Sequence, residues 1–187
     1  MRENLIDLVA NHTPFDDVEK EHTLNTLAFL NQNRNCTSTD NLVGHITASA
    51  WVLSPKLSAV LLTHHKKLNR WLQLGGHIEN DATIHQAAHR EAVEESGIDK
   101  INFLENSVFD IDIHPIPTRN NIAGHLHYDI RFLLQAETTE FVLSPESNEL
   151  AWVDLASIGE LLSDESMLRM CRKSEIYLKC PRCSGHN

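Results

Sequence analysis

The chain has 187 residues, 41% of them hydrophobic and 22% charged, an ordinary composition for one full-sized globular domain with its own core. Its 16 basic and 26 acidic residues give a formal net charge of −10. Such a surface repels phosphate backbones, so we expect no nucleic-acid polymer as a partner, although a small phosphorylated ligand that brings its own divalent cation is not excluded.

The N-terminal part of the chain predicts two helices and no targeting segment. It has no apolar run long enough for a signal peptide, and no later stretch reaches the roughly 18 apolar residues that span a bilayer. Apolar residues recur at helical spacing over residues 3–11 and 16–32. Residues 31–41, NQNRNCTSTDN, are typical of a linker. We therefore expect a cytoplasmic protein, without membrane association, that begins with a helical segment over residues 1–40.

Two strands are expected after the linker, over residues 45–54 and 58–65, joined at a Ser-Pro turn. A short apolar piece, residues 71–74, then runs directly into Gly75 and Gly76. Two consecutive glycines allow a backbone to approach a ligand closely. Such a turn has no obvious use on a plain surface helix.

A central helix is expected over residues 82–96, with Asp81 as its N-cap and Gly97 in the left-handed conformation that ends it. Further strands and two closing helices are expected after it, with the strands over residues 102–114, 125–135 and 149–153. Strands before and after a central helix, with helices at both ends of the chain, predict an α/β fold with a mixed sheet.

Three acidic residues of the central helix, Glu91, Glu94 and Glu95, project from one face near its C-terminus. Their mutual repulsion and the helix dipole together oppose folding by roughly 1–3 kcal/mol. Such an arrangement is explained by a hard divalent cation, which prefers carboxylate oxygens. The alternative is a solvated acidic face, which is common on surface helices. The neighbouring Gly75-Gly76 turn favours the cation.

These residues form a pattern that resembles the Nudix box, G-x5-E-x7-R-E-U-x-E-E-x-G-U, in which U is a bulky aliphatic residue. Over residues 76–98 the chain has Gly76-x5-Ala82-x7-Arg90-Glu91-Ala92-x-Glu94-Glu95-x-Gly97-Ile98. So many fixed positions rarely coincide by chance. With the strands around the box, the resemblance covers roughly residues 44 to 160. It places a Nudix domain at residues 41–160, between the N-terminal helical segment and a C-terminal helix with a cysteine-containing tail over residues 161–187.

The resemblance implies an α/β/α sandwich and a hydrolase that cleaves a phosphoanhydride bond in a nucleoside diphosphate linked to another moiety, or in a similar small organic pyrophosphate. It implies that Mg²⁺ or Mn²⁺ is held by the three glutamates and the carbonyl of Gly75. Arg90 would pair with Glu94 and hold the carboxylates in place. The metal would activate a water for attack on phosphorus, with an acidic residue taking its proton.

One position departs from the family pattern, because Ala82 stands where the first glutamate of the box is expected. Glu79 and Asp81 are close enough in sequence to replace it. The departure keeps open a non-catalytic Nudix-fold module that binds or senses a nucleotide. An isomerase of isoprenoid diphosphates also uses this fold, but it would need a cysteine acid in the pocket, and Cys36 lies in the linker. A protein-interaction role of the N-terminal helices is a further alternative.

Polar residues alternate along the two strands after the box, so one side of each strand either faces water or lines a cleft. Asp110, Asp112 and His114 share a face of the first strand, and His125, His127, Asp129 and Arg131 share a face of the second. Two histidines at such spacing also suit a transition metal, but a cleft-lining role is the favoured interpretation. The predicted substrate-binding residues are Gly76, His77, Arg119, His125, His127 and Asp129.

The cysteines do not form the pattern of a disulfide framework. Cys180 and Cys183, with His186 and the more distant Cys171, suggest a zinc site, whereas zinc sites usually combine two ligand pairs. An ordinary tail is therefore the favoured interpretation of this segment. The basic segment from His64 to Lys67 is interpreted as a solvated loop. The oligomeric state is left open, a homodimer included.

Overall fold

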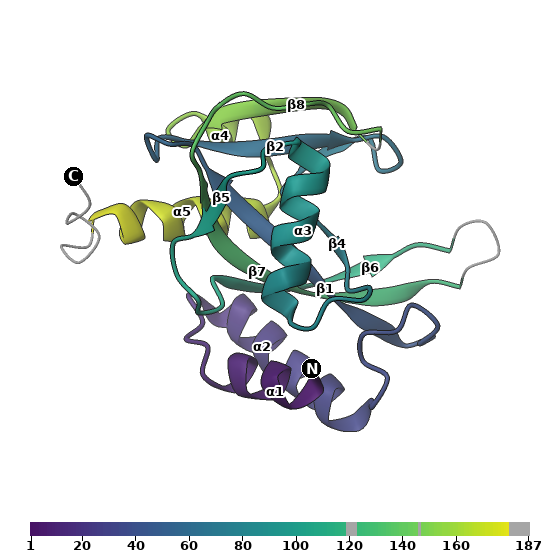
Figure 1. The fold of residues 1–187 in the computed structure, drawn as a ribbon. Helices are drawn as coiled ribbons and strands as arrows, with labels where there is room; N and C mark the ends of the chain where they lie inside the picture. The colour runs from purple at the N-terminus through teal and green to yellow at the C-terminus, as the bar shows by residue number, and fades with distance from the viewer. Residues whose placement is uncertain (119–122, 146, 180–187) are drawn as a thin grey trace.

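A computed structural model describes residues 1–118, 123–145 and 147–179 of the chain (Figure 1). The described helices are α1 (Arg2–Ala10), α2 (Asp17–Gln32), α3 (Ile84–Ser96), α4 (Ile158–Leu161) and α5 (Glu165–Lys179). The described strands are β1 (Gly44–Leu53), β2 (Ala59–His65), β3 (Arg70–Leu72), β4 (Leu74–His77), β5 (Ile101–Phe103), β6 (Asp110–Ile116), β7 (His125–Ala136) and β8 (Ser147–Asp154). No helix in this part of the chain is long and apolar enough to cross a membrane.

The described strands form one mixed, eight-stranded sheet in which β1 and β7 are the central pair. These two long strands run parallel and stay in register from Gly44 opposite Leu126 to Leu53 opposite Gln135. The path through the sheet is β3-β2-β1-β7-β5, with β4 paired to β1, β6 to β7 and β8 to β2. β1 and β2 pair next to the turn that joins them, where Leu53 lies opposite Val60. Farther from that turn, β1 pairs with β4 instead. The glycine pair of β4 therefore lies directly beside β1.

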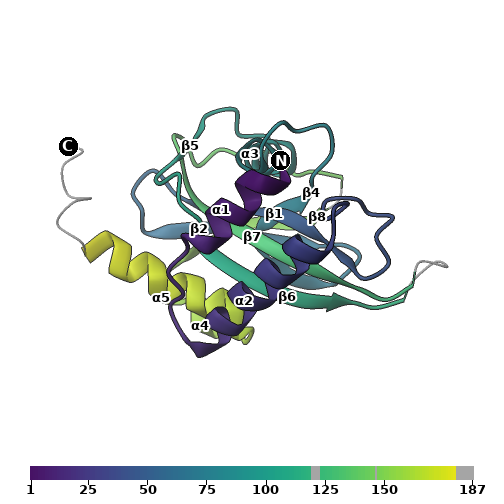
Figure 2. The same cartoon turned by 90° about the horizontal axis from the view of Figure 1, so that it is seen from below.

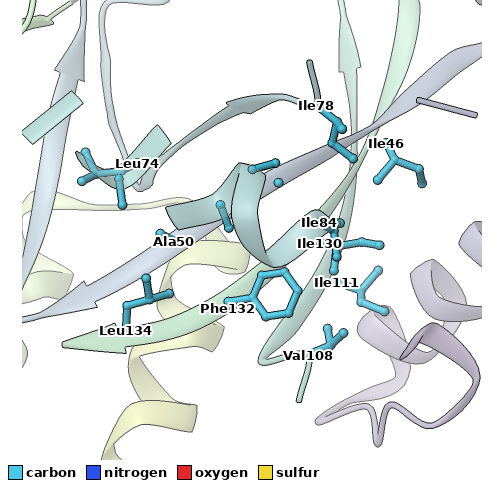
Figure 3. Close-up of a cluster of buried hydrophobic side chains, with 14 of the residues drawn as sticks. Ile46, Ala50, Leu74, Ile78, Ile84, Val108, Ile111, Ile130, Phe132 and Leu134 are labelled. Atoms are coloured by element: carbon cyan, nitrogen blue, oxygen red, sulfur yellow. The ribbon is translucent and has the colours of Figure 1, made fainter. Parts of the chain in front are cut away.

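Helices cover both faces of the sheet and thus confirm the expected α/β sandwich (Figures 1 and 2). Alternate residues of β1 separate two apolar clusters: Ile46 and Ala50 face α3, while Trp51 and Leu53 face α4 and α5. Figure 3 shows the first cluster, where side chains of β1, β7 and α3 meet around Phe132. In the second cluster, the indole of Trp51 donates a hydrogen bond to the hydroxyl of Ser174 in α5 (2.8 Å).

The N-terminal helices join the same core as α3. Leu5 and Val9 of α1 and Phe29 and Leu30 of α2 are buried in the first cluster. The ring of Phe29 stacks on that of Tyr128 in β7, with centroids 4.0 Å apart. Figure 2 shows α2 lying over β6, where the two elements are in contact. The N-terminal segment therefore contributes to the core and covers β6.

The start of α3 differs from the prediction, in which Asp81 was its N-cap. The N-cap is Thr83, whose hydroxyl accepts a hydrogen bond from the amide of Gln86. The side chain of Gln86 in turn accepts a hydrogen bond from the amide of Ala82 (2.9 Å). Side chains thus satisfy two backbone amides at the start of the helix. Gly97 ends the helix in the left-handed conformation, as expected, with φ of 67°.

The single strand expected over residues 102–114 is wrong, because the structure has β5 and β6 separated by residues 104–109. Both pair with β7, β5 near its C-terminal end and β6 along its N-terminal half. The intervening segment includes Glu105-Asn106-Ser107, residues that favour turns. One long strand thus serves as the partner of two shorter ones.

Candidate functional site

One face of the sheet is polar where β1, β4, β6 and β7 lie side by side. The register puts Thr47 of β1 opposite Asp129 of β7 and, on the other side, opposite His77 of β4. Directly paired residues share a face of a sheet, so the polar residues predicted to alternate along β6 and β7 do lie together. Leu126 and Ile130 point to the opposite face and pack into the core.

A cleft of about 1050 Å³ lies over this polar face. Residues of the box form one wall, namely Gly75, Gly76, His77, Glu79, Arg90, Glu91, Glu94 and Glu95. Residues of β1, β6 and β7 form another, namely His45, Thr47, Ser49, Asp112, His114, His125, His127, Asp129 and Arg131. The fold therefore brings together nearly all of the predicted site residues that the structure describes.

The three glutamates of α3 reach the cleft in different environments. Glu95 is buried, and its Oε2 accepts a hydrogen bond from the amide of Gly75 (2.9 Å). Glu91 lies against Gly76, where an added Cβ would come within 2.7 Å of its Oε1. The side chain of Glu94 is 61% exposed. The Gly-Gly turn thus makes the space in which the carboxylates of α3 meet the backbone of β4.

Gly75 is required by its conformation as well as by its contacts. Its φ of 151° lies in a region that other residues rarely adopt. A Cβ there would lie 2.6 Å from Cα of Ser49 and 2.7 Å from the carbonyl oxygen of Ala48, both backbone atoms of β1. A side chain at this position would therefore separate β4 from β1.

Arg90 lines the cleft and holds two of the three glutamates. Its Nη1 donates to Oε1 of Glu91 (2.9 Å) and to Oε2 of Glu94 (3.0 Å), and its Nη2 donates to the carbonyl of His77 (2.9 Å). Asp81 accepts further hydrogen bonds from Arg90, the two shortest from Nε to Oδ1 (3.1 Å) and from Nη2 to Oδ2 (2.9 Å). The carboxylate that anchors Arg90 thus comes from Asp81, the neighbour of Ala82.

These contacts shift the acidity of the groups involved. The hydrogen bond from Arg90 lowers the pKa of Asp81, and the bond to Asp81 raises the pKa of Arg90. Burial raises the pKa of Glu91 against the opposing effect of Arg90, and the charges of Glu94 and Glu79 add to this rise. Glu91 therefore sits in a region with an excess of negative charge.

The donor set at this wall fits a hard divalent cation. It offers the carboxylates of Glu91, Glu94 and Glu95, and Mg²⁺ prefers such oxygen ligands. A Cβ at Gly76 would fill the space beside Glu91, so the glycine keeps that space accessible. A bound cation would favour the ionised form of Glu91, whose pKa is raised chiefly by burial.

Asp129 lies beneath the cleft and is almost completely buried. Its Oδ1 accepts hydrogen bonds from Thr47 (2.9 Å) and Ser49 (2.8 Å), and its Oδ2 accepts them from Gln73 (3.0 Å) and Arg131 (2.8 Å). Its carboxylate is thus used within the protein. These contacts favour a role in positioning β1 and β7 over direct contact with a substrate.

The histidines of the cleft form a cluster that the sequence indicated only in part. His77, His125 and His127 line the cleft, while the predicted Arg119 lies outside the described residues. His45 was not predicted, although its place two residues before Thr47 on β1 puts it on the polar face. Strand alternation was the signal that would have identified it.

Basic residues also line the cleft. His65 and Lys67 belong to the segment predicted as a solvated loop, and Arg70 was not predicted. His65, Lys67 and Arg70 line the cleft near the end of β2 and the start of β3. Arg70 also lies 3.9 Å from Asp164. Lys67 and Arg70 are cationic and line the same cleft as the glutamates of the box, so both signs of charge are available to a ligand.

The described cysteines lie apart from the cleft. Cys36 and Cys171 are free and buried in the two apolar clusters, and burial raises the pKa of each thiol. The cleft-lining residues that the structure describes include no cysteine. Cys180, Cys183 and His186, the residues of the zinc interpretation, lie outside the described residues.

Comparison with known proteins gives one family and many similar folds. A family model described as NUDIX domain matches residues 44–171. A binary complex of the Caenorhabditis elegans Ap4A hydrolase has a TM-score of 0.57 and 18% identity, covering 71% of this chain and 96% of that one. A NUDIX-family hydrolase from Clostridium perfringens has a TM-score of 0.55 and 23% identity, covering 71% and 97%.

The NUDIX domain of Shewanella oneidensis NrtR, complexed with ADP-ribose, has a TM-score of 0.51 and 15% identity. The alignment covers 81% of this chain and 97% of that domain. At such identities the solved structures show a shared fold. No curated protein matches this chain.

Proposed function

Since this chain belongs to the Nudix hydrolase family, we propose that it is a metal-dependent pyrophosphohydrolase of small molecules. Its substrate would be a nucleoside diphosphate linked to another moiety, or a similar small organic pyrophosphate. One observation carries the proposal: the three carboxylates of α3 reach the same cleft wall as the glycine pair of β4. A solvated acidic face would not explain this arrangement, because Glu95 is buried and bonded to the backbone of Gly75.

Glu91, Glu94 and Glu95 would hold Mg²⁺ or Mn²⁺, with the carbonyl of Gly75 as a further ligand. When bound, the ion would polarise the pyrophosphate and lower the pKa of a water. Arg90 holds Glu91 and Glu94 at fixed positions through one guanidinium nitrogen and is itself held by Asp81. It therefore has a positioning role. The proton of the attacking water would pass to one of the three glutamates, which are the carboxylates of α3 at the cleft.

The rest of the cleft would bind the substrate. Lys67 and Arg70 at the rim supply positive charge for a polyanion. Gly76, His77, His125 and His127 also line the cleft and would offer backbone and imidazole groups to the substrate. A volume of about 1050 Å³ is ample for a nucleotide-sized ligand. The negative net charge and the concave site favour a small molecule over a nucleic-acid polymer.

The test is hydrolysis across nucleoside triphosphates, nucleotide sugars, ADP-ribose, dinucleoside polyphosphates and coenzyme A, each with Mg²⁺, Mn²⁺ or EDTA. We expect metal-dependent turnover of one class. Glu95→Gln should lose about 100-fold or more in kcat, because the replaced group holds the ion that stabilises the transition state. Asp99→Asn is the control, since Asp99 is exposed just beyond the same helix. Turnover that survives EDTA, or is unchanged in Glu95→Gln, would contradict the proposal.

The alternative is a Nudix fold that binds a nucleotide without turning it over. Ala82 favours it, because the first glutamate of the box is missing. Asp81 weakens it, since its carboxylate already anchors Arg90 through hydrogen bonds. The same panel separates the two functions. Thermal stabilisation by one ligand with no product under any metal would identify a binding module.

A further inference from the structure

His45 is a buried polar residue without a partner. It lies at the start of β1, is 1% exposed, and has no hydrogen-bond partner for either ring nitrogen. Buried polar groups are nearly always satisfied, because an unpaired one retains its full desolvation cost. The ring lines the cleft. Its two nitrogens therefore point to a ligand from outside the chain.

Histidines from neighbouring strands surround this ring. The centroid of His45 is 4.6 Å from that of His127 and 5.0 Å from those of His77 and His125. One ring nitrogen from each of His45, His77 and His127 lies within 4.8 Å of the other two. The sheet enforces this proximity, because His45 pairs with His127 and His77 pairs with Thr47.

We propose that His45, His77 and His127 bind a transition-metal ion of the Zn²⁺ type, at a site distinct from the glutamates of α3. Imidazole nitrogens suit Zn²⁺, Ni²⁺ and Cu²⁺, whereas Mg²⁺ selects oxygen ligands. Nitrogens that share one tetrahedral Zn²⁺ at about 2.0–2.1 Å stand roughly 3.3 Å apart. The three nitrogens lie within 4.8 Å of one another on paired strands, so metal binding would require them to approach more closely.

The fourth position of such a site faces the cleft. His77 is the exposed member of the three, and the cleft also holds the glutamates. Sites with three histidines and one open position bind water or a substrate oxygen there. If the proposed hydrolase function holds, a phosphate oxygen of the substrate would occupy it. Binding of the metal itself does not depend on that function.

The test uses the untagged full chain carrying Cys180→Ser and Cys183→Ser, so that tail cysteines cannot supply a second site. After the metal is stripped with a chelator, Zn²⁺ is titrated calorimetrically in excess Mg²⁺. We expect one equivalent of Zn²⁺ per chain. We also expect the visible absorption of nitrogen-coordinated Co²⁺ when Co²⁺ replaces it. The absence of stoichiometric binding would overturn the proposal.

Variants locate the site and separate the two metal proposals. His77→Ala, at an exposed position, should abolish the Co²⁺ absorption. It should also weaken Zn²⁺ binding by more than roughly 10–100-fold, the loss of affinity typical when a residue that only supports a metal ligand is removed. His45→Ala should do the same. His64→Ala is the matched control, because His64 is not among the residues that line the cleft. Equal binding by His77→Ala and wild type would overturn the proposal. Glu95→Gln should retain Zn²⁺ binding even where hydrolysis is lost or was never present.

Discussion

Among the single residues of the cleft, Gly76 leaves little room for a side chain, since an added Cβ would lie 2.7 Å from Oε1 of Glu91. The clashing atoms are the end of a flexible side chain, so Gly76→Ala should cost no more than about 1 kcal/mol of stability. It would displace the Glu91 carboxylate. Because displacements of about 1 Å cost on the order of 100-fold, we expect a comparable loss of kcat.

The matched control is Gly159→Ala, because nothing lies within 4 Å of a Cβ at Gly159 in α4. This variant should keep both the kcat and the midpoint of urea unfolding of the wild type. Wild-type turnover in Gly76→Ala would show that kcat does not depend on the position of the Glu91 carboxylate. A large loss of stability would show that the glycine is required by the fold.

The box residues could be predicted individually, whereas their partners could not. The pattern identified Arg90 and the three glutamates, because their spacing along one helix is a local property. Asp81 was considered as a substitute for the missing glutamate, and the hydrogen bonds to Arg90 are visible only in the folded chain. His45 was missed, because its neighbours come from β4 and β7 and are distant in sequence.

At the level of elements, α2 was predicted from periodicity, but its place in the core was not. Leu30 of α2 is fully buried, while Leu24 on the same helix is 59% exposed. We expect Leu30→Ala to lower the free energy of unfolding by about 2–5 kcal/mol, because it leaves a cavity in the shared core. Leu24→Ala should change it by less than about 0.5 kcal/mol.

Urea unfolding followed by both far-UV circular dichroism and tryptophan fluorescence would check this. The two probes should report one transition, since α2 and the strands share an apolar cluster. A Leu30→Ala protein whose fluorescence transition stays at the wild-type midpoint would contradict the shared core. The N-terminal helices would then behave as a separate unit.

Element boundaries were predicted well where the local sequence pattern sets them, and poorly where pairing with another strand sets them. Residues 16–32 and β7 agree with their expected bounds within a residue or two. The expected strand over residues 102–114 failed, because β7 is long enough to pair with β5 and β6 in succession. Alternation along one segment cannot reveal where its partner strand begins and ends.

On the scale of the whole molecule, Glu19 connects distant parts of the chain. It is fully buried in α2 and accepts hydrogen bonds from His12 (2.8 Å), from Lys173 of α5 (2.6 Å) and from the amide of Ile111 in β6 (3.1 Å). Burial alone would raise the pKa of Glu19. The bond from His12 and the charge of Lys173 outweigh burial and hold it well below its usual range.

A depressed carboxyl pKa stabilises the fold above the unfolded pKa, about 4.3, and that contribution is lost as the pH falls below it. We therefore expect the midpoint of urea unfolding to drop between about pH 5 and pH 3. Glu19→Gln should flatten this part of the profile. Glu21→Gln, on the same helix but exposed, should keep the wild-type slope. Identical slopes in the two variants would contradict the role of Glu19.

Strand β4 pairs with β1 one residue to one, from Thr47 opposite His77 to Ala50 opposite Leu74. One inserted or deleted residue between β3 and α3 would turn Gly75, Gly76 and His77 to the opposite face of the sheet. Substitutions along the polar face of β1, β6 and β7 leave that ladder intact. In evolutionary terms, new substrate preferences in this lineage should arise by point substitution on those strands, while the length of the segment from β3 to α3 is conserved.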